Sequence, residues 1–304
     1  MSDRTFHNVT IIGAGVSGMT CALYLSRANI DVCLVGDYCT TPLLASPSIR
    51  NYPGIKDISG AGYLINLHDQ VSERGVSIIE GTAMAPVRNG DKWVVLTDAG
   101  NIIDTNIVVI ATGSSARLLN LEKEEEFIGK GVSTCAYCDG PIYEGKNVCV
   151  IGSGTLAIEE AMYLSKICKR VTVLCRKSQF STCLYTPDQL SKYPNVTVVF
   201  DAPVKRINVL ENRVTVVLDG NLTRIMPFDG VFYAIGSLPN TRFLDGSFPI
   251  DENGYITLTD ELSAKYGMYA CGDVNAHNKN KQVVTAAADG CNTALKILKD
   301  LRNR

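Results

Sequence analysis

One stretch decides the fold: residues 9–18 read Val-Thr-Ile-Ile-Gly-Ala-Gly-Val-Ser-Gly. Four β-forming residues end at a glycine-rich turn, and residues 19–28 then carry apolar side chains at helical spacing. A second apolar run, residues 30–35, follows directly. This succession of strand, tight turn, helix and strand predicts a βαβ unit with a buried parallel sheet.

The pattern occurs a second time along the chain. Residues 147–151 read as a strand, and a Gly-Ser-Gly-Thr-Leu-Ala turn, a helix and a strand follow up to residue 174. Two other apolar strands, residues 107–114 and 230–237, both break at Gly-Ser. The repeat predicts an α/β protein of two doubly wound, Rossmann-like, three-layer domains.

The second domain interrupts the first. Strand signals resume after Pro239, at residues 254–257 and 267–270, and a helical stretch at residues 283–301 closes the chain. The first domain is therefore expected to comprise residues 1–114 and 245–304, and the inserted domain residues 115–244.

Shorter features fall between these main elements. Antiparallel strands outside the main parallel sheets are expected within residues 82–100 and 196–229, with turns at Asn89-Gly90 and Asp219-Gly220. The charge run at residues 122–126 reads as a solvated turn.

The composition is that of an ordinary globular chain. Its 304 residues favour two domains, and 46% hydrophobic residues suffice for a normal core. With 29 Lys and Arg against 31 Asp and Glu, the net charge of −2 argues against binding of nucleic acid or an anionic membrane. No apolar run approaches the roughly 18–20 residues of a membrane span, and the start lacks a signal-peptide core, so a cytoplasmic protein is expected. Eleven cysteines, an odd number, argue against a secreted disulfide framework.

The first glycine turn has the GxGxxG pattern between a strand and a helix, the context that a dinucleotide site requires. Gly13 allows the tight turn, Gly15 lets the backbone approach a pyrophosphate, and Gly18 permits close packing of helix on strand. The helix N-terminus offers N–H donors to the phosphates. Asp37 is the candidate for the acidic residue that contacts a ribose after the second strand.

The second glycine turn has the degenerate form GxGxxA, with Gly152 and Gly154. Arg176 and Lys177 follow the next strand, where the 2′-phosphate of NADPH would lie. Solvated cations after a strand are an equally good interpretation, so NADPH binding stays open at this point.

Cys135 and Cys138 form a Cys-x-x-Cys motif followed by Asp139. Two cysteines at this spacing can close a small disulfide ring, and a lowered thiolate pKa suits such a pair to exchange. A zinc site would need a second pair, and Cys168, Cys175 and Cys183 lack the spacing for it. A redox dithiol is the favoured interpretation; zinc ligands and inert cysteines are the alternatives.

Two glycine turns on either side of this dithiol resemble the low-molecular-weight thioredoxin reductase family. The resemblance covers essentially the whole chain. Its other motifs are Asn51-Tyr52-Pro53-Gly54, Ala111-Thr112-Gly113, Ile235-Gly236 with Pro239-Asn240-Thr241, Tyr269-Ala270-Cys271-Gly272-Asp273-Val274, and Gln282 before the last helix.

The resemblance implies an outer domain that binds FAD and an inserted domain that carries the dithiol and an NAD(P)H-type site. Cys138 would face the flavin, Cys135 would attack the partner's disulfide, and Asp139 would protonate the departing thiolate. Asp273 would contact the ribityl–phosphate part of FAD, and Gln282 and Val283 would lie by its ring system. The cofactor-binding residues implied in full are Gly13, Gly15, Gly18, Asp37, Asn51, Ala111, Thr112, Gly113, Gly272, Asp273, Gln282 and Val283.

The chain departs from the family pattern mainly where NADPH would bind. Leu156 stands at a small-residue position of the second turn, Lys177 replaces an arginine, and Ser181 replaces the last arginine of the phosphate clamp. A lysine lacks the two-pronged donor geometry of arginine. The other departure, Thr40-Thr41-Pro42 in place of Gly-Gly-Gln, lies in the FAD domain.

This distribution is similar to that of the ferredoxin-dependent flavin thioredoxin reductases. The expected activity is transfer of two electrons through FAD and the dithiol to thioredoxin or a thioredoxin-like protein, with reduced ferredoxin favoured as donor. The ordinary NADPH-dependent enzyme is the first alternative, and a dithiol oxidase that uses oxygen is the second. The resemblance also implies a homodimer.

Overall fold

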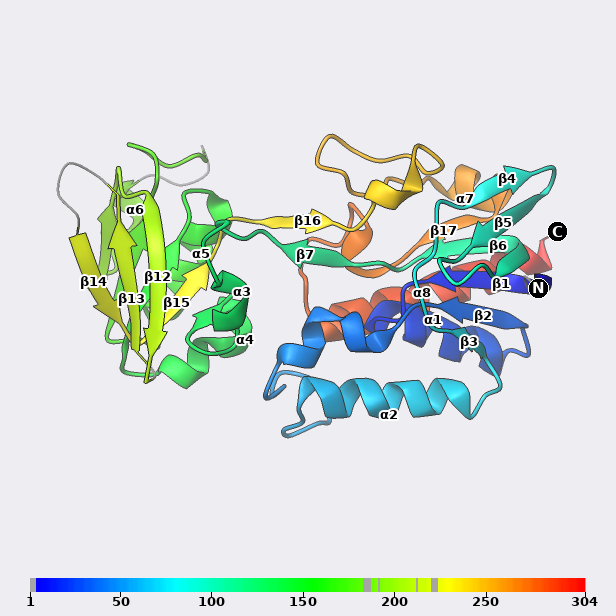
Figure 1. Cartoon of the computed structure of the whole chain (residues 1–304), viewed down its shortest axis with the longest axis horizontal. Coiled ribbons are helices and arrows are strands. Elements are labelled where there is room, and N and C mark those ends of the chain that lie inside the picture. Colours follow the sequence, from blue (N-terminus) through cyan, green and yellow to red (C-terminus); the bar gives the residue numbers. More distant parts are fainter. Residues whose placement is uncertain (1–3, 183–186, 191, 212, 220–223, 304) are drawn as a thin grey trace. The chain divides into compact units, whose positions relative to one another are not determined.

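The structure is a computed structural model that describes residues 4–303 except 183–186, 191, 212 and 220–223. Contacts divide the chain into two compact units, Met1–Ser115 with Leu238–Arg304, and Ala116–Ser237 (Figure 1). We call them unit 1 and unit 2. The inserted domain was expected to end at Leu244, whereas unit 2 ends at Ser237. Leu244 belongs to unit 1, because it is buried there in a cluster with Trp93 and Phe248.

Unit 1 is built on a mainly parallel sheet whose central strand is β1. The strand order is β3-β2-β1-β6-β5-β4, and β17 pairs with the second half of β6. The carboxyl half of β1 is completely buried, as expected for a parallel sheet covered on both faces. The strands are β1 (Arg4–Ile12), β2 (Val32–Val35), β3 (Ser77–Ile79), β4 (Val87–Asn89), β5 (Lys92–Leu96), β6 (Ile102–Ile110) and β17 (Met268–Ala270).

Helices cover one face of this sheet. α1 packs between α2 and α8 over a core that includes Leu25, Leu64 and Ile297. The antiparallel hairpin β4–β5 contributes Trp93 to the core on the other face, which completes three layers. The helical elements are α1 (Val16–Arg27), η1 (Tyr38–Thr40), η2 (Pro42–Ala45), α2 (Gly60–Ser72), η4 (Arg242–Leu244), α7 (Asp260–Tyr266), η5 (Gly272–Val274) and α8 (Val283–Arg302).

Unit 2 repeats the architecture on a smaller scale. Its five parallel strands have the order β11-β10-β9-β15-β8, and a separate antiparallel sheet has the order β12-β13-β14. The chain enters and leaves through β7 (Ser114–Ala116) and β16 (Ser237–Pro239), which pair with each other. The strands are β8 (Val132–Ser133), β9 (Asn147–Ile151), β10 (Arg170–Leu174), β11 (Val196–Val199), β12 (Val204–Leu210), β13 (Arg213–Leu218), β14 (Arg224–Phe228) and β15 (Gly230–Tyr233).

The helices of unit 2 are short. Cys135 is the N-cap of α4, which contains Cys138, and α5 follows the second glycine turn. The elements are α3 (Glu124–Phe127), α4 (Ala136–Asp139), η3 (Gly140–Tyr143), α5 (Thr155–Leu164) and α6 (Pro187–Leu190). Both units are thus doubly wound α/β domains, one inserted into the other, and the predicted fold class is confirmed.

Three local expectations were wrong in part. Residues 196–199 were expected to be antiparallel, but β11 pairs parallel with β10, and only β12–β14 are antiparallel. Within the charge run, Glu122 and Lys123 form an exposed turn, but α3 begins at Glu124, which is only 3% exposed. The Glu124 carboxylate accepts hydrogen bonds from the N–H groups of Leu119 and Leu121 and from the Tyr233 hydroxyl. Residues 254–257 form no strand but only isolated bridges of Ile256, to Ile250 and Asn275.

The remaining local features follow the pattern more closely. The turn at Asn89-Gly90 joins β4 to β5 as predicted, with Gly90 at φ +61°. Gly220 and Cys183 lie outside the described residues. Within the described ranges, no helix is both long and apolar enough to span a membrane.

The two glycines of the second turn provide a matched pair for a stability test. A Cβ on Gly152 would lie 2.3 Å from the carbonyl oxygen of Ala234, whereas a Cβ on Gly154 would meet nothing within 4 Å. We predict that Gly152→Ala lowers the free energy of unfolding by about 1–3 kcal/mol, because it overpacks the junction of β9 and β15. Gly154→Ala should change it by less than about 0.5 kcal/mol. Urea denaturation of the full chain measures both, and equal losses would contradict the packing argument.

Candidate FAD and dithiol sites

The first glycine turn packs closely against the backbone at Ala111, and the first turn of α1 packs closely against the backbone at Gly13. A Cβ on Gly13, which has φ +116°, would lie 2.4 Å from the carbonyl oxygen of Ala111, and one on Gly18 would lie 1.9 Å from that of Gly13. Gly15 is the N-cap of α1, with no side-chain cap and no acidic residue in the first turn. The N-terminus of this 12-residue helix is therefore suited to a pyrophosphate.

The segments that the family resemblance singled out meet beside this turn. Asn240 donates from Nδ2 to the carbonyl oxygen of Thr112 at 2.9 Å, and the Thr112 hydroxyl donates to the carbonyl oxygen of Asn240 at 2.7 Å. The N–H of Asn240 donates to the carbonyl oxygen of Gly113 at 3.0 Å. Ala111, Thr112 and Gly113 are thus fixed at the end of β6, next to Gly13.

Gly272 and Asp273 approach the same turn from the other end of the chain. A Cβ on Gly272 would lie 2.3 Å from Oγ of Ser17, in the first turn of α1. The N–H of Gly272 donates to Oδ2 of Asp289 at 2.6 Å. Burial raises the pKa of Asp273 to about 6; the nearby Lys281 lowers it and Asp289 raises it further. A half-buried carboxyl group at this position suits hydroxyl groups of a ligand, from which the carboxylate can accept hydrogen bonds.

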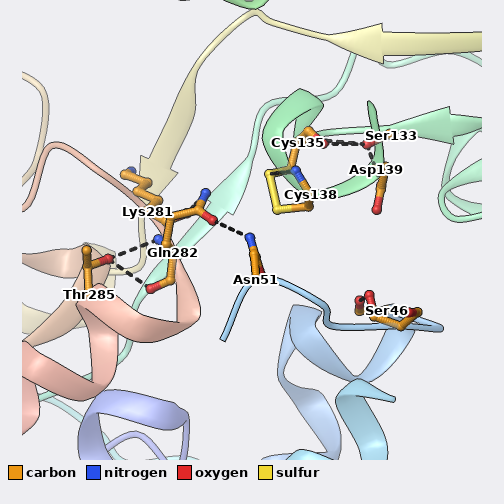
Figure 2. The surroundings of a disulfide bond; sticks show 10 residues. Ser46, Asn51, Ser133, Cys135, Cys138, Asp139, Lys281, Gln282 and Thr285 are labelled. Atoms are coloured by element: carbon orange, nitrogen blue, oxygen red, sulfur yellow. Dashed lines mark hydrogen bonds between the residues drawn. A yellow bond between two sulfur atoms is a disulfide. The ribbon is translucent and has the colours of Figure 1, made fainter. Parts of the chain in front are cut away.

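Asn51 and Gln282 also lie together. Nδ2 of Asn51 donates to Oε1 of Gln282 at 3.0 Å, and Gln282 caps α8 through a reciprocal capping box with Thr285 (Figure 2). Val283 opens α8 and packs against the core. Next to them, Lys281 donates from Nζ to the hydroxyls of Ser114 at 3.0 Å and Tyr255 at 2.6 Å.

Asp37 is placed just after β2, where a ribose partner is expected. Its Oδ1 already accepts a hydrogen bond from the N–H of Cys39 at 2.7 Å and caps η1. The departing segment Thr40-Thr41-Pro42 lies close to the turn, since Cγ2 of Thr41 is 3.4 Å from the Cβ position of Gly15. Together these features of unit 1 fit FAD: a glycine turn with close backbone contacts, an uncapped helix N-terminus and the half-buried carboxyl group of Asp273.

Unit 2 holds the dithiol as a disulfide. Cys135 and Cys138 are bonded across α4 with their Cα atoms 5.3 Å apart, and the N–H of Cys138 points to Sγ of Cys135 at 3.2 Å. Cys138 is exposed and Cys135 is half-buried. Among the residues that the structure describes, no three His, Cys, Asp or Glu side chains form a group that could hold a metal ion.

The free thiols differ from this pair in burial. Burial raises the pKa of Cys33 to about 12 and those of Cys168 and Cys175 to about 11, so these thiols stay protonated near neutral pH. Cys39 is the exposed one among the described free cysteines.

Asp139 is held beside the disulfide by Ser133. The Ser133 hydroxyl donates to Oδ2 of Asp139 at 2.6 Å and accepts from the N–H of Cys135 at 3.0 Å (Figure 2). Burial raises the pKa of Asp139, and the hydrogen bond from Ser133 opposes this increase only in part. A carboxyl group with a raised pKa can carry a proton closer to neutrality than an exposed one.

The second glycine turn is covered by its own chain. The N–H of Ser181 donates to the carbonyl oxygen of Ser153 at 2.7 Å, and the two hydroxyls are 2.9 Å apart. The hydroxyl of Thr155, the first residue of α5, lies 2.8 Å from that of Thr182. Leu156 is 40% exposed in the first turn of α5.

Arg176 and Lys177 follow β10, where the sequence placed them, and both are exposed. Gly152 makes the close contact with Ala234 described above, so this turn keeps the geometry of a nucleotide-binding turn. The side chains that contact this turn from residues 181–182 are hydroxyls rather than arginines.

Sequence reasoning missed several residues of these sites. Ser133 carries no motif, and only the fold brings it to Asp139. Asp289 and Lys281 lie in or next to α8 and reach Gly272 and Tyr255 through tertiary contacts. Glu160 had a local signal, because it shares the buried face of α5 with Ala157, Ala161 and Leu164.

Comparisons with known proteins show the family of this chain. A family described as pyridine nucleotide-disulphide oxidoreductase matches residues 7–290. The thioredoxin reductase of Rickettsia typhi is 32% identical over 303 residues, which cover 96% of this chain and 97% of that protein. The NADPH-dependent thioredoxin reductase 3 of Arabidopsis thaliana is 32% identical over 305 residues, 95% of this chain and 57% of that protein.

Solved structures show the same relationship. The crystal structure of thioredoxin reductase from Streptococcus pyogenes superimposes with a TM-score of 0.89 at 30% identity, covering 98% of this chain and 99% of that chain. The match is therefore close to full length in sequence and in structure. This chain belongs to the pyridine nucleotide-disulphide oxidoreductase family, within its low-molecular-weight thioredoxin reductases, and is an FAD-dependent oxidoreductase.

Proposed function

We propose that the protein reduces the disulfide of thioredoxin or a thioredoxin-like protein through the Cys135–Cys138 dithiol. The observation that carries this proposal is the disulfide with the half-buried carboxyl group of Asp139 next to it, because a dithiol exchange needs both a thiolate and a proton donor. FAD, when bound in unit 1, supplies the electron pair that opens the disulfide.

The dithiol then performs two exchanges. The Cys135 thiolate attacks the partner's disulfide, an S–S bond to the partner forms, and the released partner thiolate takes a proton from Asp139. The Cys138 thiolate attacks Sγ of Cys135, which restores the Cys135–Cys138 bond and releases the second partner thiolate, to be protonated by solvent. The partner gains two electrons and two protons, and the dithiol returns to the disulfide.

The two cysteines should be separable by mutation. Cys138→Ser should trap a stable mixed disulfide between Cys135 and a thioredoxin, because the resolving thiol is absent. Cys135→Ser should leave a Cys138 thiolate able to give a long-wavelength charge-transfer band with oxidised FAD. Absorption spectra and non-reducing mass spectrometry measure both. A band that appears only in Cys138→Ser would reverse the two roles.

Asp139→Asn should slow turnover with thioredoxin by about 10²–10⁴-fold, because the amide cannot deliver a proton. The raised pKa of Asp139 gives the sign of the pH dependence. Activity of the wild type should fall as pH rises through that pKa, and the variant should lose this limb of the profile. Ser133→Ala is the matched variant: it keeps the acid and removes the hydrogen bond that opposes the increase, together with the one that the Ser133 hydroxyl accepts from the Cys135 N–H. The limb should then move to higher pH. If activity of Asp139→Asn still fell with rising pH in the same way, another group would supply the proton to the partner thiolate.

We further propose reduced ferredoxin as the electron donor. The covered second turn, the exposed Leu156 at its helix end and the serine in place of the last clamp arginine all disfavour a bound NADPH. The driving force is sufficient: a plant-type ferredoxin at about −400 mV and thioredoxin at about −270 mV leave about 6 kcal/mol for two electrons. NADPH remains the alternative, since one Arabidopsis relative is named an NADPH-dependent enzyme.

Anaerobic mixing of the purified holoenzyme with each donor decides between them. Reduced ferredoxin should bleach the flavin rapidly and support turnover with thioredoxin, while NADPH and NADH should act slowly or not at all. One lost arginine contact predicts a loss of about 10–150-fold. The triple variant Leu156→Ser, Lys177→Arg and Ser181→Arg should improve reduction by NADPH, and Lys205→Arg on β12 should not. Reduction of the wild type by NADPH within seconds at sub-millimolar concentration would return the chain to the NADPH-dependent enzymes.

The remaining assignments belong to the same proposal. A homodimer is supported by exposed apolar side chains on the three adjacent helices of unit 1: Tyr24 on α1, Ile65 on α2 and Leu295 on α8. A cytoplasmic location is supported by the eight free cysteines among the described residues, since a reducing compartment keeps thiols free.

A further inference from the structure

Glu160 is a buried carboxyl group that the proposed exchange does not use. It lies in the second turn of α5, is 3% exposed, and shares its helix face with apolar side chains. Its Oε2 has no hydrogen-bond partner among the described residues. A buried carboxylate with an unpaired oxygen is costly and needs an explanation.

The partner of this carboxyl group is the backbone of the dithiol loop. It accepts a hydrogen bond from the N–H of Ala136, the residue directly after Cys135. Ala136 is itself completely buried, and the segment stays close to α5 afterwards, since a Cβ on Gly140 would lie 3.0 Å from Cδ2 of Leu164. Glu160 is thus attached to the peptide group between the two cysteines.

The surroundings favour the neutral form of this acid. Burial raises the pKa of Glu160 to about 7, and the hydrogen bond from Ala136 only partly opposes it. The titratable groups of the elements that pack against α5 are mostly acids, thiols and phenols. They are Cys135, Tyr137, Cys138 and Asp139 on the dithiol segment, Tyr143 on η3, Glu159 and Tyr163 on α5, Cys149 on β9, and Arg170, an exposed cation at the first residue of β10.

We propose that Glu160 is a positioning residue for the dithiol: its carboxyl group holds the Ala136 N–H and fixes the backbone between the cysteines, and its charge controls how readily Cys135 becomes a thiolate. A negatively charged Glu160 repels a thiolate on Cys135, the residue before Ala136, whereas a neutral Glu160 does not. The inference deepens the proposed function, because it concerns the thiol that the proposal assigns to attack.

The test measures Cys135 directly and needs neither donor nor thioredoxin. The full-length holoenzyme with Cys138→Ser, which leaves Cys135 as a single thiol, is treated with iodoacetamide from pH 5.5 to 9, and alkylation of Cys135 is quantified by peptide mass spectrometry. Glu160→Gln keeps a hydrogen-bond acceptor for Ala136 and removes the charge.

The ratio of the alkylation rate in Glu160→Gln to that in the parent should be close to one at pH 5.5, where Glu160 is protonated and therefore as uncharged as glutamine. It should rise through pH 7 to about threefold to tenfold at pH 8.5, where the parent carries the charge. Glu159→Gln, its neighbour on α5, should keep the ratio near one throughout. A ratio that is independent of pH, or an equal rise in Glu159→Gln, would overturn the proposal, because a purely structural change affects all pH values alike.

A second measurement does not depend on whether Glu160→Gln folds. The carboxyl carbon of Glu160 in the ¹³C-labelled wild type is titrated by NMR in the oxidised and the reduced protein. Reciprocal coupling requires a higher pKa for Glu160 in the reduced protein, where a thiolate can form. Equal values would overturn the proposal. Neither result depends on thioredoxin turnover, so failure of this inference is distinguishable from failure of the proposed function.

Discussion

Close approach of one backbone to another at the carboxyl ends of β1 and β9 is the constraint on which both units depend. At Gly13 the neighbouring carbonyl belongs to Ala111, and at Gly152 it belongs to Ala234. Each contact joins the strand before a glycine turn to a strand about 80–100 residues later, and each sets the position of the helix that starts next. The cofactor cradle of unit 1 and the seat of α5 in unit 2 follow from the same packing rule, which a methyl group would break.

The same geometry has different surroundings in unit 2, although α5 also starts without a side-chain cap. In unit 1 the helix that follows the turn presents an uncapped N-terminus, as a phosphate site requires. In unit 2 the corresponding end of α5 lies next to the hydroxyls of residues 181–182, and the middle of α5 supports the dithiol loop through Glu160. One helix therefore meets the covered turn at one end and the redox loop along its face. The proposed loss of nucleotide binding need not disturb the second contact.

The sequence predicted what depends on local pattern and short spacing. Two glycine turns, the parallel strands around them and the dithiol could be read directly, because buried strands and tight turns leave little choice of residue type. Glu124 could not, since its run of acidic neighbours looks solvated until the chain brings Tyr233 and two backbone N–H groups to its carboxylate. Residues 254–257 have strand composition but find only isolated bridge partners. Ser133 and Lys281 were missed for the same reason: their roles come from tertiary contacts alone.

Burial of most of the described free thiols has a consequence for chemical selectivity. In a chain with eleven cysteines, random oxidation would yield many wrong pairings unless most thiols were slow to react. A thiol with a pKa of about 11, as at Cys168 and Cys175, has roughly one molecule in ten thousand ionised at pH 7. Thiols with a high pKa therefore react slowly with electrophiles and oxidants, because only the thiolate form is reactive. Such a protein can cycle one disulfide through many turnovers in the presence of its own spare thiols without scrambling.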